Sequence, residues 1–132
     1  MLVCWAPGQR SSIHDHAASD CFLTVLSGGV DELLYAPVEM EAPAPGAAVP
    51  CAPPRLVGAG ALAAGDGCVS HISNAAGLHA LACAASATGG AVSLHCYAPP
   101  IRRLTTFDPA RGEATSRAPG FLSVRGVPTP QE

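Results

Sequence analysis

The sequence predicts an all-β protein, and three observations support this. Short runs of apolar and β-branched residues recur along the 132 residues, glycine or proline bounds each run, and no long amphipathic helix stands out. Turn signals such as Gly28-Gly29 and Gly89-Gly90 separate these runs. Many short strands with this punctuation are typical of a sandwich or barrel. The expected strands are residues 2–5, 21–27, 30–35, 78–84, 91–97 and 102–107.

The stretch between residues 36 and 64 is rich in proline, alanine and glycine. Proline cannot donate to a sheet hydrogen-bond ladder, so no central strand is expected before about Leu56. We therefore expect one domain over residues 1–132, with a surface excursion at about 37–55. The last residues could add one more strand, and a frayed tail is expected from about residue 124.

Composition excludes several classes of function. The net charge is -3 and all seven basic residues are arginines, of which only Arg102 and Arg103 are adjacent, so a nucleic-acid binder is disfavoured. No apolar run approaches the ~18–20 residues that cross a bilayer, so no membrane association is expected, and a signal-peptide pattern is missing at the start. Without such a peptide, the six cysteines are expected to be free thiols. The expectation is a soluble, cytoplasmic protein, with a monomer as the default.

His14 and His16 stand one residue apart in the stretch SSIHDHAASDCF. On a strand such residues point to the same face, roughly 6–7 Å apart. Histidine is a good ligand for first-row metals, and a catalytic metal needs several protein donors with positions left open. His79 begins a predicted strand and could be the third donor, because strands distant in sequence become neighbours in a jelly roll. From spacing alone, a buried and hydrogen-bonded core histidine is the favoured interpretation of His79.

The run SLHCY places Ser93, His95 and Tyr97 on one side of a strand. These groups are costly to bury unpaired, so they form a hydrogen-bond relay, line a wet cavity or belong to a satisfied core network. A nucleophilic Ser-His-Asp site is disfavoured, because no G-x-S-x-G elbow exists and Ser93 lies on a strand. His71 has no second donor nearby and is interpreted as structural.

Several of these motifs together resemble the cysteine dioxygenases, which are thiol dioxygenases of the cupin superfamily. From Gly8 to Gly28 the chain fits the cupin pattern G-x5-H-x-H-x4-E-x6-G, except that Cys21 occupies the glutamate position. The match covers nearly the whole chain, although the second cupin motif is looser. The motifs that carry it are, in order, PGQRSSIHDHAASDCF, LSGGVDELLY, NAAGLH, AVSLHCYAPP and TTFDPARG.

The resemblance implies a jelly-roll cupin barrel, the double-stranded β-helix, with one Fe(II) per chain. Its ligands would be His14, His16 and His79. The implied reaction adds both atoms of O2 to the sulfur of free L-cysteine and gives cysteine sulfinate, a step of cysteine catabolism and taurine biosynthesis. Alternatives are a dioxygenase of another small thiol, 3-mercaptopropionate, and a truncated non-catalytic cupin.

The resemblance also assigns roles around the metal. Cys21 would be joined to Tyr97 by a thioether bond. Tyr97 and His95 would contact the substrate, and Ser93 would orient His95. Family members carry an N-terminal region with an arginine for the substrate carboxylate. Because Met1 falls after that region and Arg10 lies elsewhere, the chain is expected to be N-terminally truncated.

Overall fold

The computed structural model describes residues 1–121 and 123–129, and these residues form strands and no helix. The all-β prediction is therefore confirmed. Among the described residues there is consequently no helical segment with the length and apolar character needed to cross a membrane. All six cysteines are free, as expected.

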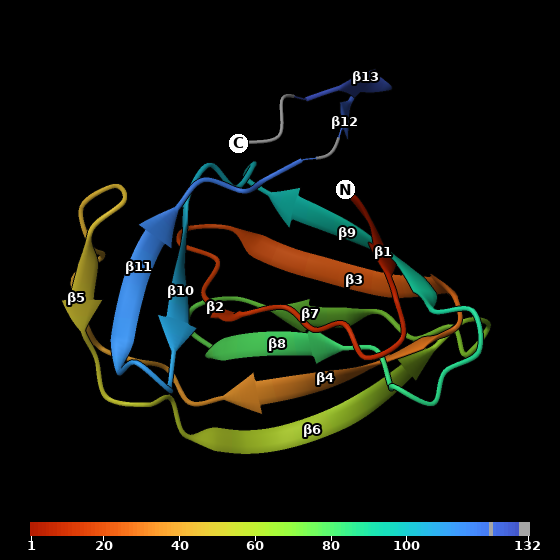
Figure 1. The fold of residues 1–132 in the computed structure, drawn as a ribbon, viewed down its shortest axis with the longest axis horizontal. Helices are drawn as coiled ribbons and strands as arrows, with labels where there is room; N and C mark the ends of the chain where they lie inside the picture. The colour runs from red at the N-terminus through yellow and green to blue at the C-terminus, as the bar shows by residue number, and fades with distance from the viewer. Residues whose placement is uncertain (122, 130–132) are drawn as a thin grey trace.

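A four-stranded antiparallel sheet forms one layer of the barrel. Figure 1 shows its long strands β9 and β3 running beside each other, with the N-terminal strand β1 crossing near them. In spatial order its strands are β1 (Leu2–Trp5), β9 (Ala91–Ala98), β3 (Asp20–Ser27) and β7 (Ser70–Ile72).

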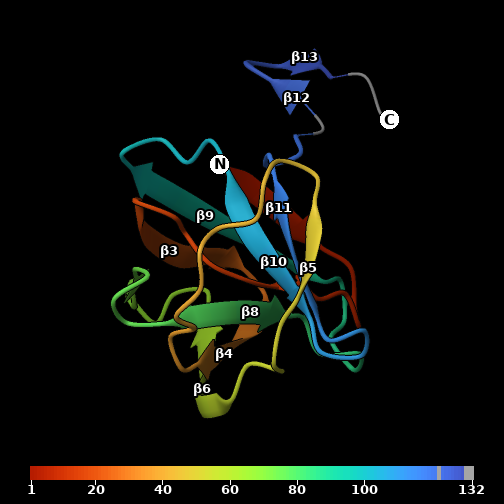
Figure 2. The same ribbon diagram turned by 90° about the vertical axis from the view of Figure 1, so that its left-hand side faces the viewer.

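The second layer is a seven-stranded antiparallel sheet. Figure 1 shows β8, β4 and β6 facing the first sheet, and Figure 2 shows β10, β11 and β5 closing one end. This closure of two facing antiparallel sheets gives the expected jelly-roll barrel. In order, its strands are β5 (Ala48–Pro50), β11 (Glu113–Arg117), β10 (Leu104–Asp108), β2 (Ile13–His14), β8 (Leu78–Ala82), β4 (Gly29–Tyr35) and β6 (Leu56–Ala63).

Each of the six expected strands has a counterpart in the structure. Five other strands were not expected, namely β2, β5, β6, β7 and β11. Strand β6 has the sequence LVGAGALA, in which small residues replace the bulky alternating residues that mark a strand. It is also largely exposed. Strand β5 lies within the expected excursion of residues 37–55. It includes Pro50, which is tolerated there because β5 is the edge of its sheet.

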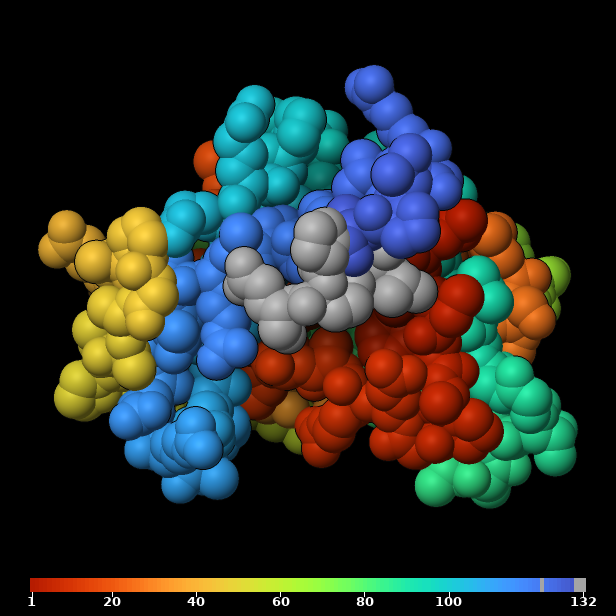
Figure 3. All heavy atoms as spheres, turned by 45° about the horizontal axis from the view of Figure 1, so that its top comes forward, coloured from red at the N-terminus to blue at the C-terminus, as the bar shows by residue number. Residues whose placement is uncertain are grey.

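The last part of the described chain returns to its beginning, since Pro119 and Gly120 line the same cavity as Met1 and Val3. Strands β12 (Ser123–Val124) and β13 (Val127–Pro128) form a small hairpin, and Figure 3 shows the dark blue residues of this part of the chain beside the red N-terminal residues. The tail predicted from about residue 124 thus forms this hairpin in part. Residues 122 and 130–132 of the predicted tail lie outside the described residues.

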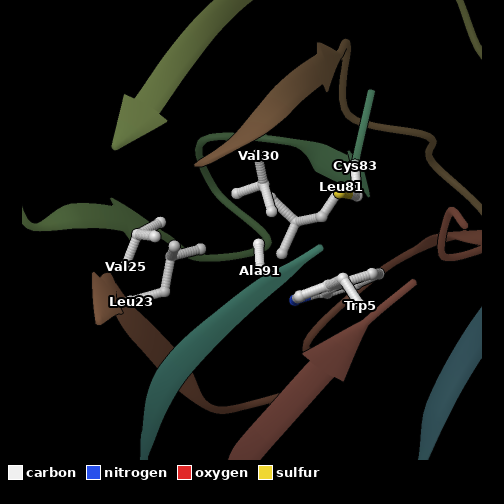
Figure 4. Packing of buried hydrophobic residues seen from close by; sticks show 7 residues of the cluster. All are labelled: Trp5, Leu23, Val25, Val30, Leu81, Cys83 and Ala91. Carbon is white, nitrogen blue, oxygen red and sulfur yellow. The ribbon is translucent and has the colours of Figure 1, made fainter. Parts of the chain in front are cut away.

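Two apolar clusters fill the barrel. The first cluster, drawn in Figure 4, joins Trp5, Leu23, Leu81 and their neighbours between the two sheets. The second packs Ile13, Leu78 and Phe107 at the end closed by β10 and β11. The candidate site is built from inward-facing polar residues of the same strands.

Candidate metal centre

Three histidines meet inside the barrel. Strands β2 and β8 are paired through His14 and His79, and His16 follows directly after β2. One ring nitrogen from each residue lies within 4.8 Å of the others. His16 and His79 are 0% and 1% exposed, and His14 is partly buried. The structure thus brings together the three residues that the sequence singled out.

The backbone around His16 is held by two side chains. The His16 amide donates to Asn74 Oδ1 at 2.7 Å, and the Thr105 amide donates to Asp15 Oδ1 at 2.7 Å. Ile13 anchors the other end of β2 in the second apolar cluster. These contacts explain why the short segment HDH has a fixed direction although β2 is only two residues long.

The hydrogen bonds of His14 and His79 leave their inner nitrogens without a proton. His14 Nδ1 lies 3.0 Å from the Ser12 carbonyl oxygen, and His79 Nδ1 lies 2.7 Å from Glu32 Oε1. Both partners are acceptors, so each neutral ring carries its proton on Nδ1. The two Nε2 lone pairs then face each other at 3.2 Å. A cation between them would satisfy both.

His16 supports the same conclusion. Its two ring nitrogens are buried, and neither has a hydrogen-bond partner among the described residues. Leaving such groups unpaired costs about 1–3 kcal/mol each, which native structures usually avoid. Three imidazoles are a donor set that iron, copper, nickel and zinc accept. The arrangement therefore fits a first-row metal ion.

Burial keeps the rings of His14 and His16 uncharged at neutral pH. Desolvation, and then the nearby His79, lowers the pKa of His14 to about 4 and the pKa of His16 to about 3. Neutral imidazole is the form that binds a metal. His14 and His16 can thus bind a metal near pH 7 without first losing a proton.

Glu32 is a site residue that the sequence reasoning missed. It lies on β4, is 6% exposed, and accepts hydrogen bonds from His79 Nδ1 at 2.7 Å and from Ser70 Oγ at 2.5 Å. Burial would raise the pKa of Glu32, but these two hydrogen bonds outweigh it and lower the pKa. A carboxylate on a ligand's outer nitrogen fixes its tautomer and makes it a stronger donor. The available signal was a charged residue at an inward position between Val30 and Tyr35.

Ser93, His95 and Tyr97 form a hydrogen-bonded series on β9. Ser93 Oγ lies 2.8 Å from His95 Nε2, and His95 Nδ1 lies 3.4 Å from the Tyr97 hydroxyl. Burial lowers the pKa of His95 to about 4 and raises the pKa of Tyr97. Trp5 was not predicted as part of this series. Its indole N–H donates to Ser93 Oγ at 2.9 Å.

Cys21 lies opposite Tyr97 in the β3–β9 register. The Cys21 thiol is fully buried, and burial raises its pKa to about 11 against an opposing hydrogen bond from Tyr97. The cluster of potential metal donors found among the described residues does not include Cys21. The thiol is thus placed beside the phenol.

A cavity of about 300 Å³ opens beside His14, His95 and Tyr97. Its remaining wall is mostly apolar, with Trp5, Leu81 and Leu104 among the lining residues. No lysine or arginine lines it within the described part of the chain. This size suits a small molecule that reaches the three-histidine cluster at His14.

His71 lies outside this site. Its ring is about half exposed, bonds Asp20 Oδ1 at 2.8 Å and stacks on Phe22. This surface position agrees with the structural interpretation of His71.

Comparison with known proteins identifies the family. A family profile described as cysteine dioxygenase type I matches residues 1–110. Cysteine dioxygenase type 1 of Danio rerio is 34% identical over 137 residues, which cover 100% of this chain and 60% of the relative. The Homo sapiens protein of the same name is 32% identical over 130 residues, which cover 98% of this chain and 59% of the relative. The chain thus spans about 60% of the length of these relatives. From its fold, its three-histidine cluster and these matches, the chain belongs to the cysteine dioxygenase type I family, whose members have the cupin fold.

Proposed function

We propose that the protein is a non-haem iron thiol dioxygenase whose substrate is free L-cysteine. The observation that carries this proposal is the set of three histidines whose ring nitrogens converge within 4.8 Å of one another, beside a small cavity that His14, Tyr97 and His95 line. The names of the relatives, cysteine dioxygenase type 1, support the same assignment.

The metal proposed is one Fe(II) per chain, held by His14, His16 and His79. When bound, ferrous iron supplies a Lewis acid for the substrate thiolate and the electron-transfer chemistry that activates O2. The three ligands are neutral, but Glu32 adds a buried negative charge in contact with His79. This charge offsets part of the metal charge and stabilises the cation in the barrel.

The proposed reaction is balanced without a co-reductant. Cysteine thiol and O2 combine to give the sulfinic acid, so the sulfur loses four electrons and O2 gains them. The role of the protein is to hold the two reactants together in an enclosed cavity. Tyr97 is proposed to donate a hydrogen bond from its hydroxyl to the substrate. His95 and Ser93 hold that phenol in position.

We also propose that Cys21 and Tyr97 become joined by a thioether. The direct pairing of the two residues and the Tyr97–Cys21 hydrogen bond support this. A bond from Cys21 Sγ to the Tyr97 ring requires loss of the thiol hydrogen and one ring hydrogen. Dioxygen would take up the two electrons and two protons. The bond would lock the Tyr97 ring and so keep the hydroxyl at the cavity.

A test of the substrate is direct, because two small thiols differ only in the amino group. The protein is loaded with Fe(II), and O2 uptake and sulfinate formation are measured with L-cysteine and with 3-mercaptopropionate. We expect one sulfinate per O2 and a higher kcat/KM for L-cysteine than for 3-mercaptopropionate. The surface variant His71→Gln is the control and should have the same kcat/KM values as the unmodified protein. A higher kcat/KM for 3-mercaptopropionate would make it the substrate. Bound iron without O2 uptake would identify a non-catalytic cupin.

A further inference from the structure

Trp5 ends β1 and places its indole nitrogen at β9. The side chain is 7% exposed and packs in the first apolar cluster, where Figure 4 shows it beside Leu81 and Ala91. Its Nε1–H donates to Ser93 Oγ at 2.9 Å in a buried contact. An indole nitrogen is a donor only and cannot accept a hydrogen bond. This end of the polar series therefore has a fixed direction.

The direction passes to His95 through Ser93. Ser93 is 0% exposed, and Trp5 and His95 are its only side-chain partners among the described residues. Because Trp5 cannot accept the Ser93 proton, the Ser93 hydroxyl donates to His95 Nε2 at 2.8 Å. A neutral His95 then carries its own proton on Nδ1.

The same reasoning reaches Tyr97. His95 Nδ1–H faces the Tyr97 hydroxyl oxygen at 3.4 Å, so the phenol is the acceptor in this contact. The phenol proton is then free to point away from His95. Tyr97 lines the cavity beside His14 and His95, so this proton is available to a molecule bound there.

We infer that Trp5 is a positioning residue that sets the direction of the whole chain Trp5→Ser93→His95→Tyr97, so that Tyr97 presents its proton to the cavity. Without the indole N–H, Ser93 could accept from His95 Nε2–H. His95 Nδ1 would then accept from Tyr97, and the phenol proton would turn away from the cavity. The Trp5 indole N–H, 88 residues from Ser93 in sequence, thus selects between the two hydrogen-bond directions of this chain.

The sequence allows a clean test, because Trp5 is the only tryptophan of the chain. Global replacement of tryptophan by β-(3-benzothienyl)alanine removes the N–H at this one position and keeps the shape of the ring. Replacement by 4-fluorotryptophan is the matched control, because it keeps the N–H. Trp5→Phe also removes the donor but leaves a cavity, so the isosteric analogue is the decisive variant.

The readout is the tautomer of His95, measured by ¹⁵N NMR of the histidine rings in the full chain with Zn²⁺ as a diamagnetic probe. The His95 signals are assigned by their loss in His95→Gln. We expect the Nδ1–H tautomer in the unmodified protein and in the 4-fluorotryptophan protein, and a shift to Nε2–H in the benzothienyl protein. An Nε2–H tautomer in the unmodified protein, or no change in the benzothienyl protein, would overturn the inference.

The consequence for catalysis rests on the proposed function, whereas the tautomer does not. With Fe(II) and L-cysteine, we expect kcat of the benzothienyl protein to fall by about 10²-fold, the lower end of the usual effect of a positioned proton donor, with KM little changed. A shifted tautomer with unchanged kcat would refute the catalytic role alone. An inactive unmodified protein with the expected tautomer would refute the proposed function alone.

Discussion

Glu32 Oε1 lies 2.7 Å from His79 Nδ1 inside the barrel, so a buried carboxylate contacts one of the three clustered histidines. The same pairing occurs on the surface, where Asp20 Oδ1 lies 2.8 Å from His71 Nε2 with both side chains about half exposed. The chain therefore offers an internal control for the effect of burial on a histidine–carboxylate pair.

Glu32→Gln tests the contribution of the buried charge. Glutamine can still accept from His79 Nδ1 through its carbonyl oxygen, so the ring direction is kept while the charge is lost. Because partners of this kind usually contribute 10–100-fold to metal affinity, we expect Zn²⁺ binding to weaken by about that factor. Chelator competition measures the affinity.

Asp20→Asn is the matched control and should bind Zn²⁺ as the unmodified protein does. Equal Zn²⁺ affinities in the two variants would show that the Glu32 charge does not act on the metal.

Cys21→Ala tests whether the thiol serves Tyr97 or the metal. Cys21 pairs with Tyr97 across β3 and β9 and is not part of the three-histidine cluster. We therefore expect iron content near that of the unmodified protein, and loss of any doublet of cross-linked and open chains on a denaturing gel. Cys96→Ala, at an exposed position of β9, should keep the doublet. Loss of iron from Cys21→Ala would make the thiol a ligand and contradict this assignment.

The metal-free protein should lose stability in mild acid. The pKa values of His14 and His95 are lowered by burial to about 4, and that of His16 to about 3, from an ordinary value of 6.5. Below pH 6.5 the unfolded chain therefore binds protons that the folded protein does not, and the free energy of unfolding falls as the pH drops toward 4. Urea unfolding at several pH values measures this slope.

His95→Gln provides the control for that slope. It removes one of the three groups but no proposed metal ligand, so between pH 6 and pH 5 the slope should decrease by about one proton, or ~1.4 kcal/mol per pH unit. Carboxylates titrate in both proteins and cancel in the difference. Identical slopes would mean that His95 is not held neutral by the fold.

Sequence reasoning found the site residues that repeat locally and missed those whose partners are distant. His14 and His16 stand in one short motif, and Ser93, His95 and Tyr97 alternate on one strand, so spacing alone placed each group on one face. Glu32 and Trp5 have no such pattern, because their partners lie 47 and 88 residues away.

The fold shows the same division between local and distant signals. Strands β3, β4 and β9 were predicted because each is a local run of apolar and β-branched residues next to a turn signal. Strand β2 was missed because two residues carry no periodicity, and its position depends on pairing with β8 and β10. Such pairing is a property of the barrel rather than of a segment.

Gly77→Ala is expected to damage both the fold and the site. Gly77 has a φ of +133°, and a Cβ there would lie 2.2 Å from the Tyr35 carbonyl oxygen, which cannot move without disturbing β4. Strain and the clash together should lower the free energy of unfolding by at least about 3 kcal/mol. Because Gly77 is two residues before His79, Zn²⁺ affinity should fall as well.

Gly89→Ala is the control, since its φ is +93° but nothing lies within 4 Å of the added Cβ, so it reports strain alone. Urea unfolding with and without Zn²⁺ compares the two variants, and an equal loss of stability would show that the barrel accommodates the contact with Tyr35.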